Sequence, residues 1–111
     1  MDYLAQSEAM TRAALERIAA CPAQELAIYG AGSHTARLLP RLLETGEKRL
    51  AGLVDGNPNL QGKRFGPLLI EAPDALDRHP AATVVVSSFR TQQAIGDALR
   101  ASRANPVLTL Y

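Results

Sequence analysis

The chain has 111 residues, of which 47% are hydrophobic and 21% charged, and its formal net charge is +1. This length supports one domain with one core, and the composition is that of a globular chain rather than a disordered or fibrous one. The charge excludes the basic excess typical of nucleic-acid binding. No apolar run approaches the ~20 residues of a membrane helix, the first residues lack the apolar region of a secretory signal, and a single cysteine excludes an internal disulfide. We expect a cytoplasmic protein.

The N-terminal stretch has helical composition. Residues 2–20 are rich in Ala, Leu, Glu and Arg, and no helix breaker precedes Pro22. We predict a helix here, and we divide the chain into an N-terminal helix over residues 1–22 and an α/β domain over residues 23–111. The added helix is suited to cover one face of the domain, or to contact a second copy of the chain or a partner enzyme subunit.

From residue 23 onward, short apolar runs alternate with helical segments. The run at 83–86, TVVV, is continuous rather than alternating, which is typical of a parallel strand buried on both faces. Residues 55–66 are dense in turn residues and predict a loop. The alternation predicts an α/β fold: a small Rossmann-like open parallel sheet of about five strands in the order 3-2-1-4-5, with helices on both faces. The predicted strands are 26–29, 50–54, 68–70, 83–86 and 107–110, and the predicted helices are 33–45, 73–79 and 90–104.

Residues 30–35, GAGSHT, join the first predicted strand to the second predicted helix. The first glycine permits a tight turn, the second lets a phosphate approach the backbone, and the free N–H groups of the helix start favour an anion. Dinucleotide-binding turns carry a third glycine at the position of Thr35, so this departure weakens the prediction of tight dinucleotide binding. Glycines at such a turn also serve packing alone.

Asp55 ends the second predicted strand, close to where an acidic residue commonly holds a ribose hydroxyl. Aspartate is also favoured at the start of turns for local reasons. In an open parallel sheet a ligand crevice opens where the strand order reverses, beyond the carboxyl ends of the first and fourth strands. The end of the fourth strand, SSFR at 87–90, is therefore expected to face the glycine turn.

Arg90 is suited to bind a phosphate or carboxylate. Ser88 taken alone is better suited to cap the next helix than to contact a ligand. Phe89 is suited to stack on a ring or to serve in the core or a lid. His34 is expected to face solvent or a ligand rather than to act in catalysis. The predicted ligand-binding residues are Gly30, Ala31, Gly32, Ser33, His34, Asp55, Ser87, Ser88 and Arg90.

No catalytic or metal-binding residues are predicted. Neither Tyr29 nor Tyr111 has a lysine three or four residues later, and His34, His79 and one cysteine do not make a metal site. We predict a nucleotide-binding module, with NAD(P) as one possible ligand. An NAD(P)-dependent oxidoreductase subunit and an interaction domain with a vestigial crevice stay as alternatives.

Three segments carry a family resemblance: IYGAGSHTARLL, LAGLVDGNPNLQGKRFG and TVVVSSFRTQQAI. Over residues 26–111 the chain resembles the Rossmann-like module at the C-terminal end of some bacterial sugar C-methyltransferases. It is similar, more loosely, to the N-terminal domains of sugar acyltransferases and nucleotide-sugar dehydratases. The resemblance implies nucleotide-sugar binding in sugar or polysaccharide metabolism, with the chemistry supplied by a partner domain or subunit.

Overall fold

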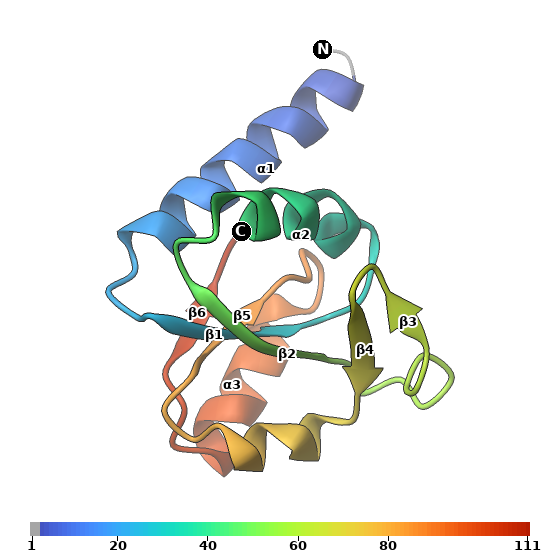
Figure 1. The fold of residues 1–111 in the computed structure, drawn as a ribbon, viewed down its shortest axis with the longest axis vertical. Helices are drawn as coiled ribbons and strands as arrows, with labels where there is room; N and C mark the ends of the chain where they lie inside the picture. The colour runs from blue at the N-terminus through green and yellow to red at the C-terminus, as the bar shows by residue number, and fades with distance from the viewer. Residues whose placement is uncertain (1–2) are drawn as a thin grey trace.

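The computed structural model describes residues 3–111, whose central feature is a six-stranded sheet between two layers of helices (Figure 1). The first two residues of the predicted N-terminal helix lie outside this range. In chain order the elements are α1 Tyr3–Ala20, β1 Glu25–Tyr29, α2 Ser33–Thr45, β2 Arg49–Val54, β3 Arg64–Phe65, β4 Leu68–Glu71, the 3₁₀ helix η1 Pro73–Arg78, β5 Thr83–Val86, α3 Gln92–Ser102 and β6 Val107–Thr109.

The strand order is β3-β4-β2-β1-β5-β6. The five mutually parallel strands, β4, β2, β1, β5 and β6, are the five that the sequence predicts, and they lie in the predicted order. The α/β prediction is therefore confirmed. Because β1 pairs with β2 on one side and with β5 on the other, the order reverses at β1, and a crevice is expected at its carboxyl end.

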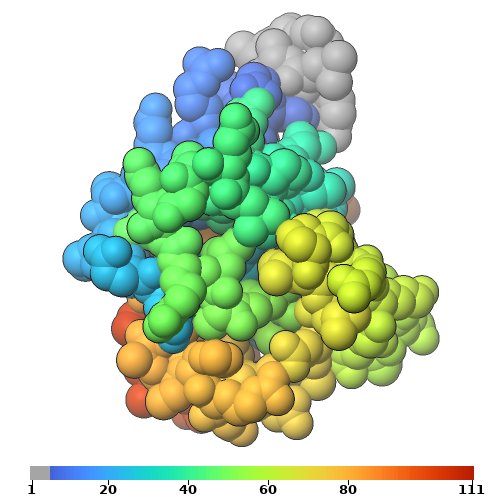
Figure 2. All heavy atoms as spheres, in the orientation of Figure 1, coloured from blue at the N-terminus to red at the C-terminus, as the bar shows by residue number. Residues whose placement is uncertain are grey.

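The edge strand β3 corrects the sequence prediction, which assigned all of residues 55–66 to a loop. Arg64 and Phe65 pair with Leu69 and Leu68 in an antiparallel hairpin. Gly66 adopts a φ of 60°, the left-handed conformation that glycine tolerates best, and this closes the turn. A strand of two residues between glycines shows no periodicity, which is why the sequence did not reveal it. The hairpin packs beside α2, as the space-filling view shows (Figure 2).

Side chains alternate between the two faces of the sheet and build two core layers. Leu26 and Ile28 join the layer beneath α1 and α2, whereas Ala27 joins the layer against η1 and α3. All four residues of β5 are buried, which confirms the prediction of a strand covered on both faces. Ala14 and Ile18 of α1 are buried in the first layer, and Glu8 of α1 forms an ion pair with Arg41 of α2 at 2.6 Å.

Two predicted helices differ in their bounds or type. Residues 73–78 form a 3₁₀ helix, and α3 spans Gln92–Ser102 rather than 90–104. The later start of α3 leaves residues 87–91 as a loop after β5. Within residues 3–111, no helix has the length and apolar character needed to cross a membrane.

Candidate nucleotide-binding site

A hollow of about 370 Å³ lies at the carboxyl ends of β1 and β5, where the strand order reverses. It is built from the glycine turn, the end of β2 and the loop after β5. Each of the nine predicted ligand-binding residues lines it, together with Phe89. The lining residues are Gly30, Ala31, Gly32, Ser33, His34, Asp55, Ser87, Ser88, Phe89 and Arg90.

The glycine turn is held by its backbone. Gly30 has a φ of 114°, a conformation that residues with a side chain rarely adopt, and its N–H donates to the Val54 carbonyl at 2.9 Å. Gly32 is the N-cap residue of α2, and a Cβ added to it would meet nothing within 4 Å. The space beside Gly32 is therefore open to an approaching ligand.

The amides at the start of α2 are available as donors. The first bond of the helix runs from the Ala36 N–H to the Gly32 carbonyl at 3.0 Å, and no side chain caps the helix. The N–H groups of Ser33, His34 and Thr35 precede that bond and so have no partner within the helix. Such a helix start attracts anions through its donors and its dipole.

Asp55 is bound to the backbone on both of its carboxylate oxygens. Oδ2 accepts from the Ala31 N–H at 2.9 Å, and Oδ1 accepts from the Asn57 N–H at 2.8 Å. The sequence allowed two roles for Asp55, binding a ribose hydroxyl or forming a local turn, and the hydrogen bond to Asn57 shows the turn-forming role. Since each carboxylate oxygen has two lone pairs, acceptor capacity toward the hollow is left. The amide of Ala31, in contrast, is already occupied.

Thr35 replaces the third glycine with a buried hydroxyl that links three elements. Its Oγ1 donates to the Gly30 carbonyl, and a hydrogen bond of 2.9 Å joins it to the Ser87 hydroxyl. The helix start is thereby fastened to the glycine turn and to the end of β5. The departure from the glycine pattern therefore has a structural role that the sequence did not reveal.

The loop after β5 corrects one alternative from the sequence. Ser88 does not cap α3: the helix begins at Gln92, its N-cap residue is Thr91, and Ser88 Oγ lies 2.6 Å from Thr91 Oγ1. Arg90 is exposed at the rim of the hollow. Because the guanidinium of Arg90 is exposed there, it is available to pair with an anion bound in the hollow.

Three aromatic rings lie together at the hollow: His34 and Phe89 line it, and Tyr111 packs against both. The His34 ring lies 5.0 Å from that of Tyr111 and 6.3 Å from that of Phe89. Partial burial lowers the pKa of His34 from its ordinary value, and the nearby charge of Arg37 lowers it further. Burial raises the pKa of Tyr111, partly offset by its hydrogen bond with Ser87 and by Arg37. His34 therefore favours the neutral form.

Sequence reasoning missed three residues that lie behind the lining of the hollow: Tyr111, Gln92 and Arg37. Gln92 binds the backbone of Tyr111 at two points: its Oε1 accepts from the Tyr111 N–H at 3.0 Å, and its Nε2 donates to the Tyr111 carbonyl. One signal was available. All parallel strands end at the same edge, so residues just after β6 were bound to lie near the hollow.

No protein-family model and no curated protein sequence matches this chain. Among solved structures, it is similar to UDP-D-quinovosamine 4-dehydrogenase from Vibrio fischeri, with 22% identity and a TM-score of 0.63, covering 78% of this chain and 77% of that one. It is also similar to RSP, a Rex-family repressor, with 17% identity and a TM-score of 0.61, covering 80% of this chain and 53% of that one. The complex of RSP with beta-NADH matches at 15% identity and a TM-score of 0.56. At these identities the likeness shows a Rossmann-type fold.

Proposed function

We propose that this chain is a binding module for a nucleotide or nucleotide-sugar, held in the hollow at the carboxyl ends of β1 and β5. One observation carries the proposal: the open amides of α2, the carboxylate of Asp55 and the guanidinium of Arg90 all border one hollow at the reversal of strand order. This is the position at which open α/β sheets bind their ligands.

Each group has a distinct role in this proposal. The amides of Ser33 and His34 hold a phosphate against the space beside Gly32. Asp55, fixed by the Ala31 amide, uses its remaining lone pairs to accept a ribose hydroxyl. Arg90 approaches from the opposite side and pairs with a second anionic group.

The sugar-metabolism role rests on two supports of different kinds. One is the resemblance of the glycine turn, the Asp55 loop and the SSFR segment to modules of sugar-modifying proteins. The other is the solved neighbour that acts on a UDP-sugar. In this reading a partner domain or subunit supplies the chemistry in the cytoplasm, and a homodimer or partner contact is a further part of the proposal.

A second candidate function is a subunit that binds a nicotinamide dinucleotide, which the NADH complex of the Rex-family neighbour favours. Replacement of the third glycine by buried Thr35 counts against it, because that glycine gives the close helix–strand packing of dinucleotide sites. Binding of UDP-sugars but not of NADH supports the first function, and the reverse preference supports the second.

The test is a ligand screen on the unmodified chain and on a pair of glycine variants. Titration calorimetry with UDP, UDP-glucose, ADP and NADH is expected to find a ligand, and a saturating ligand at 100 times its Kd raises stability by about 2.7 kcal/mol. Gly32→Ala, and more strongly Gly32→Val, is expected to weaken binding of that ligand because the added carbons occupy the space proposed for its phosphate. The melting temperature is expected to stay unchanged, since no protein atom lies within 4 Å of the added Cβ.

Gly52→Ala is the matched control, because Gly52 lies in β2 outside the hollow and its added Cβ would make an ordinary contact at 3.8 Å. A folded chain that binds none of the four ligands contradicts the proposal. Equal affinity in the parent chain and Gly32→Val places the phosphate elsewhere.

A further inference from the structure

Phe89 presents an open ring face inside the hollow. It follows β5 in the loop that replaces the predicted first turn of α3, and 52% of its surface is exposed. Large apolar side chains are usually covered, and most of those in residues 6–111 are buried in the two core layers. An aromatic ring left open beside a phosphate cradle offers a surface on which another ring can stack.

Two aromatic rings lie against Phe89. His34 stacks against it at 6.3 Å with an interplanar angle of 30°, and Tyr111 meets it edge-on at 6.0 Å and 68°. Tyr111 is in turn held through its backbone by two hydrogen bonds with the Gln92 side chain. These contacts restrict the Phe89 ring before any ligand arrives, which lowers the entropy lost on binding.

The place of Phe89 in the hollow decides which part of a ligand it meets. Asp55 stands at the end of β2, the amides of α2 lie at the end of β1, and Phe89 follows β5. Since these strands are neighbours in the order β2-β1-β5, the three groups lie in that sequence across the sheet edge. A ligand with its ribose at Asp55 and its phosphates at α2 extends its far end over Phe89.

We propose that Phe89, supported by His34 and Tyr111, is a stacking site for the second ring system of the ligand, the hexose or nucleoside joined to the phosphate farther from Asp55. This inference rests on the proposed function and defines its ligand class: a nucleoside diphosphate that carries a further ring. A hexose with an apolar C–H face and a nicotinamide nucleoside both have this chemistry. Tyr111 is a positioning residue in this scheme because it touches Phe89 and His34.

Counting each nucleoside or hexose as one ring system, the experiment compares one-ring ligands, UDP and ADP, with two-ring ligands, UDP-glucose and NADH, in Phe89→Ala by titration calorimetry. UDP and ADP test the nucleoside diphosphate part, and UDP-glucose and NADH add a hexose or a nicotinamide nucleoside. Loss of stacking is expected to weaken whichever two-ring ligand binds by about five- to 150-fold, as expected for about 1–3 kcal/mol of ring stacking. The affinity for UDP or ADP is expected to stay within about twofold.

Leu69→Ala is the matched control, since Leu69 is 50% exposed on β4 and does not line the hollow. A two-ring ligand that binds Phe89→Ala as tightly as the parent chain overturns this inference and leaves the proposed function standing. An equal loss for one-ring and two-ring ligands also overturns it. If neither kind of ligand binds the parent chain, the proposed function fails and this inference fails with it.

Tyr111 provides the second readout. Tyr111→Phe keeps the ring and is expected to keep the two-ring preference, whereas Tyr111→Ala removes the support and is expected to reduce that preference while UDP or ADP still binds. Rescue by phenylalanine separates the effect of the Tyr111 ring from that of its hydroxyl. A two-ring preference that survives Tyr111→Ala contradicts the positioning role.

Discussion

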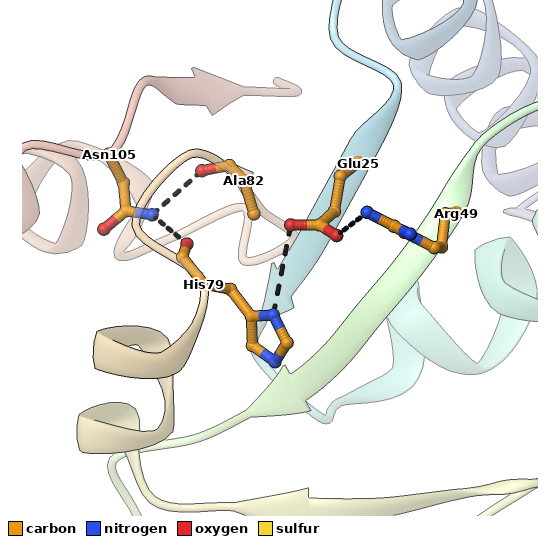
Figure 3. Close-up of polar contacts among 5 residues, drawn as sticks. All are labelled: Glu25, Arg49, His79, Ala82 and Asn105. Atoms are coloured by element: carbon orange, nitrogen blue, oxygen red, sulfur yellow. Dashed lines mark hydrogen bonds and ion pairs between the residues drawn. The ribbon is translucent and has the colours of Figure 1, made fainter.

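At the amino ends of the strands, polar side chains bind to one another, whereas at the carboxyl ends backbone donors border an open hollow. Glu25 at the start of β1 forms an ion pair with Arg49 at the start of β2, and His79 Nδ1 lies 3.9 Å from the other oxygen of Glu25 (Figure 3). Asn105 donates to the carbonyls of His79 and Ala82 at 2.8 and 2.9 Å.

The difference separates polar groups that stabilise the fold from those that are free to bind. At the amino end the carboxylate and the Asn105 amide have partners from the chain itself. At the carboxyl end the α2 amides have none within the helix, and the Phe89 ring has one open face. Substitutions at the first end are therefore expected to change stability alone, and those at the second to change ligand affinity.

The largest expected effect is that of Asn105→Leu on stability. The substitution leaves the buried carbonyl of Ala82 without its donor, whereas the carbonyl of His79 keeps the Ala82 N–H at 3.1 Å. We expect a loss of about 2–4 kcal/mol, made up of about 1–3 kcal/mol for the unsatisfied Ala82 carbonyl and about 1 kcal/mol for the lost hydrogen bond to His79. Thermal unfolding is the measurement, and a fall on the order of 10 °C is expected.

The ligand supplies the control for Asn105→Leu. The affinity of the folded variant, measured well below its melting temperature, is expected to match that of the parent chain, because Asn105 lies at the opposite end of the strands. A large loss of affinity in a folded Asn105→Leu variant would contradict the view that the amino end of the sheet affects stability alone.

The next largest effect is that of Gly30→Ala, which is expected to lower both stability and ligand affinity. Gly30 lies in the hollow, but its φ of 114° strains any residue with a Cβ, at a cost of about 1–3 kcal/mol. Urea unfolding is expected to show that loss of stability, and titration calorimetry is expected to show a lower affinity for the ligand. Gly32→Ala, two residues away without a positive φ, is the comparison and is expected to weaken the ligand only. Equal stability of the two variants contradicts the strain argument.

Strand order and the gathering of nine residues in one hollow were accessible from the sequence. Parallel strands all end at one edge, so residues that follow β1, β2 and β5 had to meet there. The bonding of Asp55 was not accessible, since local turn formation and ligand contact need the same residue type at the same position. The two hydrogen bonds between the Gln92 side chain and the Tyr111 backbone were not accessible either, because they join a helix start to a strand end 19 residues away.

The smallest expected effect concerns the two histidines, one at each end of the sheet. Because the folded chain depresses the pKa of His34 through burial and through Arg37, protonation favours the unfolded state. This small contribution to stability is present above the ordinary histidine value of about 6.5 and is lost as the pH falls through the depressed value. An anionic ligand is expected to raise the pKa of His34 instead, because its phosphates stabilise the charged imidazolium.

The affinity for a nucleotide-sugar, whose two phosphates stay ionised throughout, is therefore expected to rise roughly two- to fivefold between pH 8 and pH 5.5, the worth of one exposed charge pair. Calorimetry in buffers of different ionisation enthalpy is expected to show proton uptake on binding. His34→Gln is expected to abolish both, whereas His79→Gln, beside Glu25 at the other end, is expected to leave both unchanged. A pH dependence that follows His79 instead would link the two ends of the sheet and contradict their separation.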